Sequence, residues 1–338
     1  MKNKKWILAA ALVLWAVSGV FAGGSKAKAP VADDDYVIKI GYGIGPGLCS
    51  APFFIAEELG YFEEEGLKWE HIMIDISQIP LLLTNGTIDI TNNLLDGMIQ
   101  PIANGLEIKI PLGLHTGCTR ILVQKDGPIQ KLSDLRGKRI GTTGLASPPN
   151  IILQRYLAEE GIRTVEPNSE VEWVVYSGPE LTLALKNGQV DAIATGDPPA
   201  HAAEKEGWAR TIADTSKDGY LKDEYCCVVA VNNEVAKNHP VVLAKVLRAI
   251  QKAAKYTAEH PEETARLVAE KQYAAGNVED NIDFLKAYNY RATVSGVEKG
   301  IRRTTEDLKR IGLLDNSVDV DQLTNNVFIA IPGVPDSL

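Results

Sequence analysis

The feature that most constrains the fold of this chain is an alternation of short β-like runs with helix-period segments, which occurs twice. It lies first within residues 36–114 and again within residues 138–213. Strands that alternate with helices in this way are typical of a mostly parallel sheet with helices on its faces. The sequence therefore predicts two α/β units, and amphipathic helical segments follow the second.

The expected elements fall at regular intervals, and glycine ends many of the helices. The predicted strands, which are short apolar runs, are 36–42, 67–75, 87–91, 107–114, 138–141, 171–175, 192–195, 211–213 and 225–231. The predicted helices, which have apolar residues at helical spacing, are 51–59, 79–85, 96–104, 149–161, 179–187, 240–259, 261–272, 281–290 and 296–311. Because ligands of such sheets bind at the carboxyl ends of strands, we expect a site in the loops that follow the strands.

The first 22 residues have the pattern of a cleavable export signal. Three lysines precede an apolar core over residues 6–17, and small residues stand near Ala22, where a signal peptidase would cut. The core is too short to span a bilayer comfortably, although an uncleaved anchor is the alternative. We expect residues 1–22 to be removed without attachment of a lipid, since residues 1–48 contain no cysteine. Residues 23–35 are small and polar and are predicted to be a disordered lead.

The charge balance argues against nucleic acid as a partner. The whole chain carries 35 basic and 44 acidic residues, a net charge of −9. The predicted signal contains three lysines and no acidic residue, so its removal would leave a net charge of −12. A protein of this charge is repelled by a phosphate backbone.

The glycine-rich stretch after the first predicted strand suggests a dinucleotide-binding turn, but the motif is incomplete. The fingerprint G-x-G-x-x-G needs a third glycine, and the two possible registers place Leu48 or Pro46 there. The chain also lacks a Walker A loop, a G-x-S-x-G elbow and an H-E-x-x-H helix. We therefore predict a protein that is not an enzyme and that has no cofactor and no metal.

A set of short stretches resembles one known family. In chain order they are AEELGYFEEEGL (56–67), LSDLRGKRIG (132–141), ALKNGQVDA (184–192), DPP (197–199), HP (239–240) and HPEE (260–263). Together they resemble the solute-binding proteins of the nitrate/sulfonate/taurine ABC-transporter family, which also includes binders of thiamine-precursor pyrimidines. The resemblance covers about residues 36–313, and the order and spacing of the stretches carry it.

The resemblance implies an α/β fold of the two-lobed periplasmic-binding-protein type II class. Each lobe is expected to be a mostly parallel sheet flanked by helices, with two crossings between the lobes. The implied first lobe comprises residues 36–122 and 225–338, the latter with the C-terminal helices. The second lobe comprises residues 123–224.

The implied function is that of an extracytoplasmic solute-binding component of an ABC importer. It would capture a small anionic or zwitterionic ligand, such as a sulfonate, a nitrate-like oxyanion or a taurine-like compound, by hinge closure. Its partners would be this ligand and the permease transmembrane subunits, and we expect a monomer. The alternatives are a pyrimidine or thiamine-precursor binder and an enzyme of the pyrimidine synthase type on the same fold. Export discriminates against the enzyme, because those enzymes are intracellular.

Five loops at strand ends supply the candidate ligand-binding residues. Glycine backbones, neutral side chains and a helix start suit an anion, because helix starts carry unpaired N–H groups and a partial positive charge. The candidates are Gly45, Gly47, Cys49, Ser50, Asn92, Asn93, Asp96, His115, Thr142, Thr143, Ser147, Asn150 and Asp197. An ammonium group on the ligand could meet Asp96 or Asp197. Helix capping is the alternative role for Ser147, and His115 could be purely structural.

The sequence leaves open which chemistry the four cysteines have. They contain no C-x-x-C pair and no zinc-type spacing. By resemblance, Cys49 lies in the first cleft loop, Cys118 near the first crossing, and Cys226 and Cys227 on the returning strand. We predict that Cys118 neighbours Cys226 or Cys227. A disulfide, a thiolate site and buried free thiols are all possible.

Overall fold

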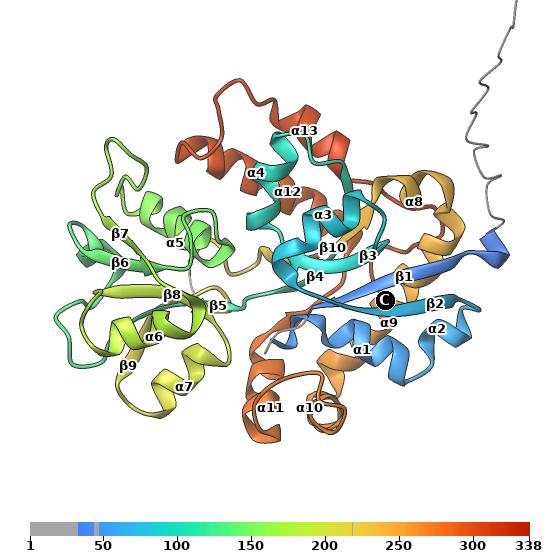
Figure 1. The fold of residues 1–338 in the computed structure, drawn as a ribbon, viewed down its shortest axis with the longest axis horizontal. Helices are drawn as coiled ribbons and strands as arrows, with labels where there is room; N and C mark the ends of the chain where they lie inside the picture. Colours follow the sequence, from blue (N-terminus) through green and yellow to red (C-terminus); the bar gives the residue numbers. More distant parts are fainter. Residues whose placement is uncertain (1–32, 44–46, 218) are drawn as a thin grey trace, which may run out of the picture. The chain divides into compact units, whose positions relative to one another are not determined.

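The computed structural model describes residues 33–43, 47–217 and 219–338, in which helices cover two sheets (Figure 1). Residues 32–338 form one unit by their internal contacts. In spatial order the first sheet contains β11 (Asn289–Tyr290), β4 (Ile108–Thr116), β10 (Tyr225–Asn232), β3 (Ile90–Leu94), β1 (Val37–Gly43) and β2 (Lys68–Ile74). The second contains β7 (Glu172–Val175), β6 (Arg139–Thr142), β8 (Ala192–Gly196), β5 (Thr119–Gln124) and β9 (Ala209–Asp214).

Both sheets are mixed, whereas the sequence predicted mostly parallel sheets. In the first sheet β1 runs parallel to β2 and β3, but β10 runs antiparallel to β3 and β4. In the second sheet β6 runs parallel to β7 and β8, but β5 runs antiparallel to β8 and β9. The chain enters β5 and β10 from the other sheet, so no helical crossover within one sheet forces either strand to run parallel to its neighbours.

Helices cover both faces of the first sheet because its central strands are apolar on both sides. Along β10, Cys227 and Val229 face one core, and Val228 and Ala230 face the other. The first core is covered by α1 (Ala51–Glu58), α9 (Pro240–Glu259), α10 (Pro261–Glu270) and α11 (Val278–Ala287). The second is covered by α3 (Ile79–Thr84), α4 (Asp96–Ala103), α12 (Val294–Arg310) and α13 (Val320–Val327). The shorter helices α2 (Tyr61–Glu64) and α8 (Asn233–Asn238) lie beside α9.

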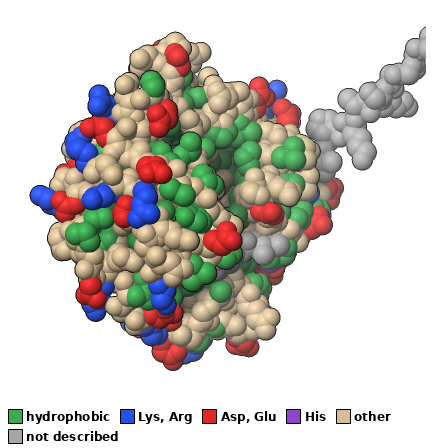
Figure 2. Space-filling view, turned by 60° about the vertical axis from the view of Figure 1, so that its left-hand side comes forward, with side chains coloured by type: hydrophobic (Ala, Val, Ile, Leu, Met, Phe, Trp, Pro, Cys, Tyr) green, Lys and Arg blue, Asp and Glu red, His purple; other side chains and the backbone are tan. Residues whose placement is uncertain are grey.

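The second sheet has the same layering with fewer helices. One face packs against α5 (Pro148–Glu159), and the other packs against α6 (Gly178–Lys186) and α7 (Pro199–Lys205). Side chains alternate along β5, where Ile121 and Val123 face α5 and Leu122 faces α6 and α7. Charged side chains of both signs are interspersed on the face drawn in Figure 2. Within the described residues, no helix has the length and apolar character needed to cross a membrane.

Most predicted elements are confirmed within a few residues, and several short ones were missed. The list of predicted elements did not include α2, α7, α8, α13, β5 or β11. Residues 281–290 were predicted as one helix, but they belong to α11 and, after it, β11. Two of the missed elements, α2 with four residues and β11 with two, are too short to show a period. Gly60 begins α2 in the left-handed conformation (φ 73°), which is how the chain turns sharply there.

The chain changes sheet twice, and the two crossing segments lie against each other. The outward change falls between β4 and β5, and the return falls between β9 and β10. The Thr215 hydroxyl donates to the Thr119 carbonyl (3.0 Å) and accepts from the N–H groups of Cys118 and Thr119 (3.1 and 3.0 Å). A Cβ at Gly117 (φ 66°) would stand 2.5 Å from the Ser216 Cα. The lobe bounds given by the resemblance, 36–122, 123–224 and 225–338, remain a prediction.

Candidate ligand cleft

The loop before α1 is joined to the end of β3. The Ser50 hydroxyl donates to the Asn92 Oδ1 over 2.8 Å, and it makes no capping hydrogen bond to α1. The Asn93 Oδ1 accepts from the N–H of Leu94 at 2.8 Å. Gly47 precedes Ser50 at partial exposure, whereas Gly45 lies outside the described residues. Ser50 and Asn92 are therefore brought together although 42 positions separate them.

The loop after β6 leads into the start of α5. Ser147 precedes this helix but makes no side-chain capping bond, and its Oγ lies 3.4 Å from the Thr142 Oγ1. Asn150 is buried, and its Nδ2 donates to the Leu145 carbonyl at 3.1 Å while its Oδ1 has no partner. Thr143 is exposed. The Ser147 hydroxyl is therefore not used as a cap, in contrast to one of its predicted roles.

The start of α5 lies against the start of α4, so the helices of the two sheets touch here. A Cβ on Gly97 would stand 2.6 Å from the Pro148 Cγ. Two turns further along α5, Arg155 donates to Asp96 at 2.9 Å and to Asp307 at 2.7 Å. The carboxylate of Asp96 is thus neutralised by an arginine from the other sheet. Figure 1 shows α4 and α5 facing each other.

Asp197, the other predicted partner for an ammonium group, is also bound to an arginine. Arg120 reaches Asp197 at 3.0 Å, Glu204 at 2.9 Å and Asp214 at 3.7 Å. Burial raises the pKa of Asp197 above its ordinary value, and Arg120 opposes that shift. A ligand ammonium would therefore have to compete with an arginine at both Asp96 and Asp197.

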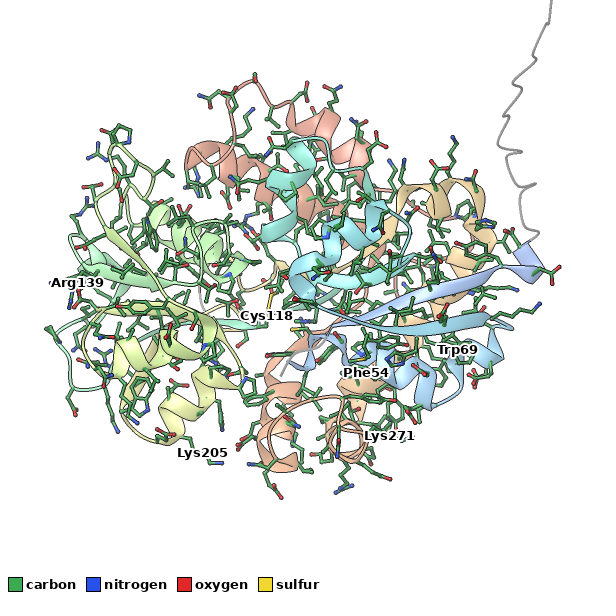
Figure 3. All side chains as sticks on the ribbon, viewed as in Figure 1. Phe54, Trp69, Cys118, Arg139, Lys205 and Lys271 are labelled. Carbon is green, nitrogen blue, oxygen red and sulfur yellow. A yellow bond between two sulfur atoms is a disulfide. The ribbon has the colours of Figure 1, made fainter. Side chains whose placement is uncertain are left out.

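The four cysteines gather beside the crossing segments, as Figure 3 shows for Cys118 between the two sheets. Cys118 and Cys226 form a disulfide with their Cα atoms 6.6 Å apart, which confirms the prediction that Cys118 neighbours Cys226 or Cys227. Cys49 and Cys227 are free thiols. The hydrogen bond with Cys227 holds the pKa of the Cys49 thiol well below its usual range, and the same bond and burial raise the pKa of Cys227.

Two tyrosines that were not predicted as site residues, Tyr288 and Tyr290, pack against His115. The His115 ring is fully buried and stacks on Tyr288 at 5.2 Å between centroids, with Tyr290 at the same distance and tilted. The Tyr290 hydroxyl donates to the Leu48 carbonyl over 2.7 Å. Burial raises the pKa of both tyrosines. The Tyr-x-Tyr spacing could have indicated that the two rings lie together, since alternate residues of an extended segment share one face.

By their positions and contacts, most of the predicted site residues fall into three groups. Cys49, Ser50, Asn92, Asn93 and His115 belong to the first sheet and its loops. Thr142, Ser147 and Asn150 surround the start of α5 in the second. Asp96 and Asp197 are engaged by arginines. The first two groups offer mainly neutral donors and acceptors, as the sequence predicted.

Comparison with known proteins identifies relatives over nearly the whole chain. The model of the family described as NMT1/THI5 like matches residues 49–264. A Bacillus subtilis (strain 168) protein named "Putative aliphatic sulfonates-binding protein" is 23% identical over 335 residues, which is 96% of each chain. A Legionella pneumophila (strain Philadelphia 1) protein named "4-amino-5-hydroxymethyl-2-methylpyrimidine phosphate synthase" is 22% identical over 85% of this chain and 89% of its own length.

Solved structures show the same fold. The periplasmic aliphatic sulphonate binding protein SsuA from Escherichia coli superposes with a TM-score of 0.69 at 19% identity, over 85% of this chain and 91% of that one. The arrangement of two sheets joined by two crossings is therefore the periplasmic-binding-protein fold, as the resemblance implied.

Proposed function

The chain belongs to the NMT1/THI5-like family, and from this premise we propose that it is the solute-binding component of an ABC importer. Its ligand would be a small anion or zwitterion held between the two sheets. The fold and the full-length similarity to a protein named for sulfonate binding support this function. Localisation outside the cytoplasm and interaction with a permease follow from the same proposal.

The observation that carries the proposal is the start of α5. Pro148 and Pro149 have no N–H, so the donors available there are the backbone N–H of Asn150 and the Ser147 hydroxyl, which does not cap the helix. The helix dipole favours negative charge at this end. Asp96 and Asp197 are each paired with an arginine, which offsets part of the negative charge that would repel an anion.

Ligand screening tests this proposal directly. The mature protein is screened by thermal shift against oxyanions, sulfonates, amino-sulfonates and pyrimidines, and calorimetry then gives the dissociation constant. A true ligand at about 100 times its dissociation constant adds roughly 2.7 kcal/mol to the free energy of unfolding. The absence of any stabilising anion or zwitterion would contradict the proposal.

A serine pair gives a matched control. Ser147→Ala should weaken binding about fivefold, or about 1 kcal/mol, with little change in stability without ligand. Ser177 begins α6 on the same sheet and forms a capping box with Glu180. Ser177→Ala should therefore lower stability by about 1 kcal/mol and leave affinity unchanged. Equal affinities for the wild type and Ser147→Ala would remove Ser147 from the site.

A pyrimidine ligand is the second candidate. One relative, which is 22% identical over 85% of this chain, is named as a pyrimidine phosphate synthase. In the same screen, stabilisation by a pyrimidine and not by sulfonates or oxyanions would favour this candidate. If mass spectrometry shows that the protein converts the bound compound into a product, the protein is an enzyme.

A further inference from the structure

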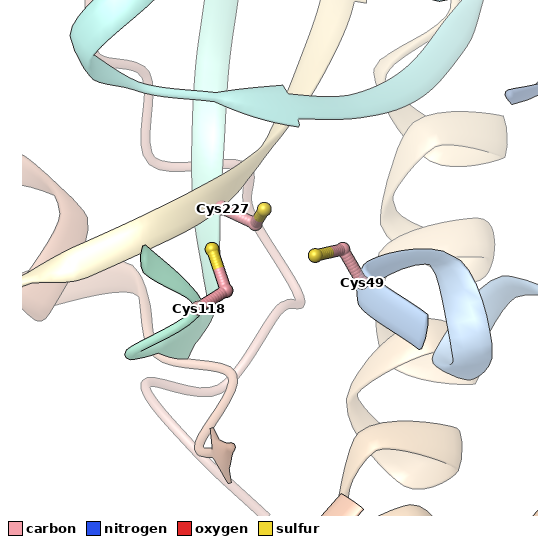
Figure 4. Close-up of side chains that lie close together, drawn as sticks. All are labelled: Cys49, Cys118 and Cys227. Carbon is pink, nitrogen blue, oxygen red and sulfur yellow. The ribbon is translucent and has the colours of Figure 1, made fainter. Parts of the chain in front are cut away.

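The two free thiols and a third sulfur converge at one point between distant segments. The sulfur atoms of Cys49, Cys118 and Cys227 all lie within 4.8 Å of one another. Figure 4 shows Cys49, from the segment just before α1, pointing across a gap toward the other two. Cys118 is bonded to Cys226, so only Cys49 and Cys227 can supply thiolates.

His115 adds a nitrogen beside these thiols. In the pairing of β4 with β10, His115 stands opposite Cys227, and residues opposite each other share one face of a sheet with their Cβ atoms about 5 Å apart. His115 Nδ1 lies 3.2 Å from the Thr116 carbonyl, so Nδ1 carries the proton. Nε2 then presents a lone pair, and it is buried without a partner. A backbone carbonyl that fixes the tautomer in this way is a common feature around metal-binding histidines.

We propose that Cys49, Cys227 and His115 form a site for a thiophilic divalent cation of the Zn²⁺ type. Two thiolates and a neutral imidazole are a ligand set that Zn²⁺ takes readily. Binding replaces two S–H bonds by two S–Zn bonds and releases two protons to solvent, so the buried assembly is electrically neutral. A monovalent cation would leave one negative charge in this apolar site, which is costly. Three protein ligands leave a fourth position for water or a bound anion. Cys49 and His115 are also candidate ligand-binding residues, but the cation site does not depend on which small molecule the protein binds.

Cobalt is the probe for this proposal, because its thiolate complexes have characteristic charge-transfer absorption. Metal-free wild type, kept without reductant to preserve Cys118–Cys226, is titrated with Co²⁺ and then with Zn²⁺. We expect one Co²⁺ per chain with thiolate charge transfer, displaced by Zn²⁺. We also expect Zn²⁺ to protect the partly exposed Cys49 thiol from iodoacetamide, a measurement on the wild type that needs no variant to fold.

Variants assign the ligands. Cys49→Ser and Cys227→Ser should each abolish the two-thiolate spectrum, and His115→Gln should weaken Zn²⁺ binding by at least about tenfold. His260→Gln is the matched control, since His260 is half-exposed at the start of α10 and should leave binding unchanged. Unchanged alkylation of Cys49 in Zn²⁺, full binding by Cys49→Ser, or a native Cys49–Cys227 disulfide found by mass spectrometry would each overturn the proposal.

Discussion

Helices of the two sheets meet at two ion-pair contacts that use the same chemistry in opposite surroundings. Between α5 and the pair α4 and α12, the Arg155 side chain is 2% exposed and contacts Asp96, Asp307 and Glu224. Between α7 and α11, the Lys205 side chain is 59% exposed and bonds Asp280 at 2.7 Å (Figure 3). If the exposed pair is broken, water can solvate both charges at little cost in free energy, but water cannot reach the buried charges to do the same. The comparison separates a contact that the fold requires from one that it tolerates.

The pKa shifts differ in the same way. Burial raises the pKa of Asp96 and of Glu224 above their ordinary values, despite Arg155. The hydrogen bond from Lys205 lowers the pKa of Asp280. Desolvation therefore dominates in the buried contact, and the attraction of the partner dominates in the exposed one.

The largest effect should come from removing Arg155. Arg155→Met leaves the buried Asp96 without a basic partner and removes one of the two arginines that contact Glu224 and Asp307, so the free energy of unfolding should fall by about 3–5 kcal/mol. Urea denaturation measures this. Combining Arg155→Met with Asp96→Asn and Asp307→Asn should recover most of the loss, because the uncompensated charge is then removed as well. If Arg155→Met lowers the free energy of unfolding by less than about 1 kcal/mol, the buried contact is energetically no different from the exposed one.

A smaller effect is expected from the covalent link near the buried contact. Cys118→Ser with Cys226→Ser opens a loop of 108 positions, which should lower the free energy of unfolding by about 2–4 kcal/mol, mainly by freeing the unfolded chain. Reduction of the wild type should lower its melting temperature and leave that of the double variant unchanged. Equal melting temperatures for the oxidised wild type and the variant would contradict the prediction.

The pH dependence of the Arg155→Met deficit follows from the raised pKa values. A carboxyl group whose pKa is higher in the folded state contributes stability below its unfolded pKa and loses that contribution as pH rises through the folded value. Without Arg155 the pKa values of Asp96 and Glu224 should rise further. The deficit relative to wild type should therefore shrink as pH falls from about 7 toward about 4. Urea midpoints at several pH values check this, and a deficit that grows in acid would refute it.

The smallest effect is expected at the exposed contact. Lys205→Ala should leave the urea midpoint unchanged within error, because the pair is solvated. The little stability that Asp280 contributes is present above its ordinary pKa and is lost as pH falls through the lowered folded value, below about pH 4. A clear loss at neutral pH would show that the two contacts are energetically alike.

The sequence predicted the layering well and the contacts between layers poorly. Strands such as β1 and long helices such as α9 follow from period and composition alone. The direction of β5 and β10 does not, because it depends on where the chain crosses between sheets. Arg155 looks like an ordinary helix residue, and only the approach of α4 and α12 makes it the centre of a buried cluster. Ser50 and Asn92 could be proposed as neighbours, since each follows a predicted strand, although Asn92 in fact lies within β3.

The Cys118–Cys226 disulfide also makes a covalent ring of the intervening chain, which contains every strand of the second sheet. A protease that cuts once within residues 119–225 would not divide the molecule, since both fragments remain joined through the two sulfur atoms. The nicked protein should migrate as one band on a non-reducing gel and as two bands after reduction. After a single cut in the second sheet, one fragment would supply β1–β4 of the first sheet and the other would supply β10 and β11. The disulfide would keep the two fragments joined, so the nicked molecule should retain its fold until the bond is reduced.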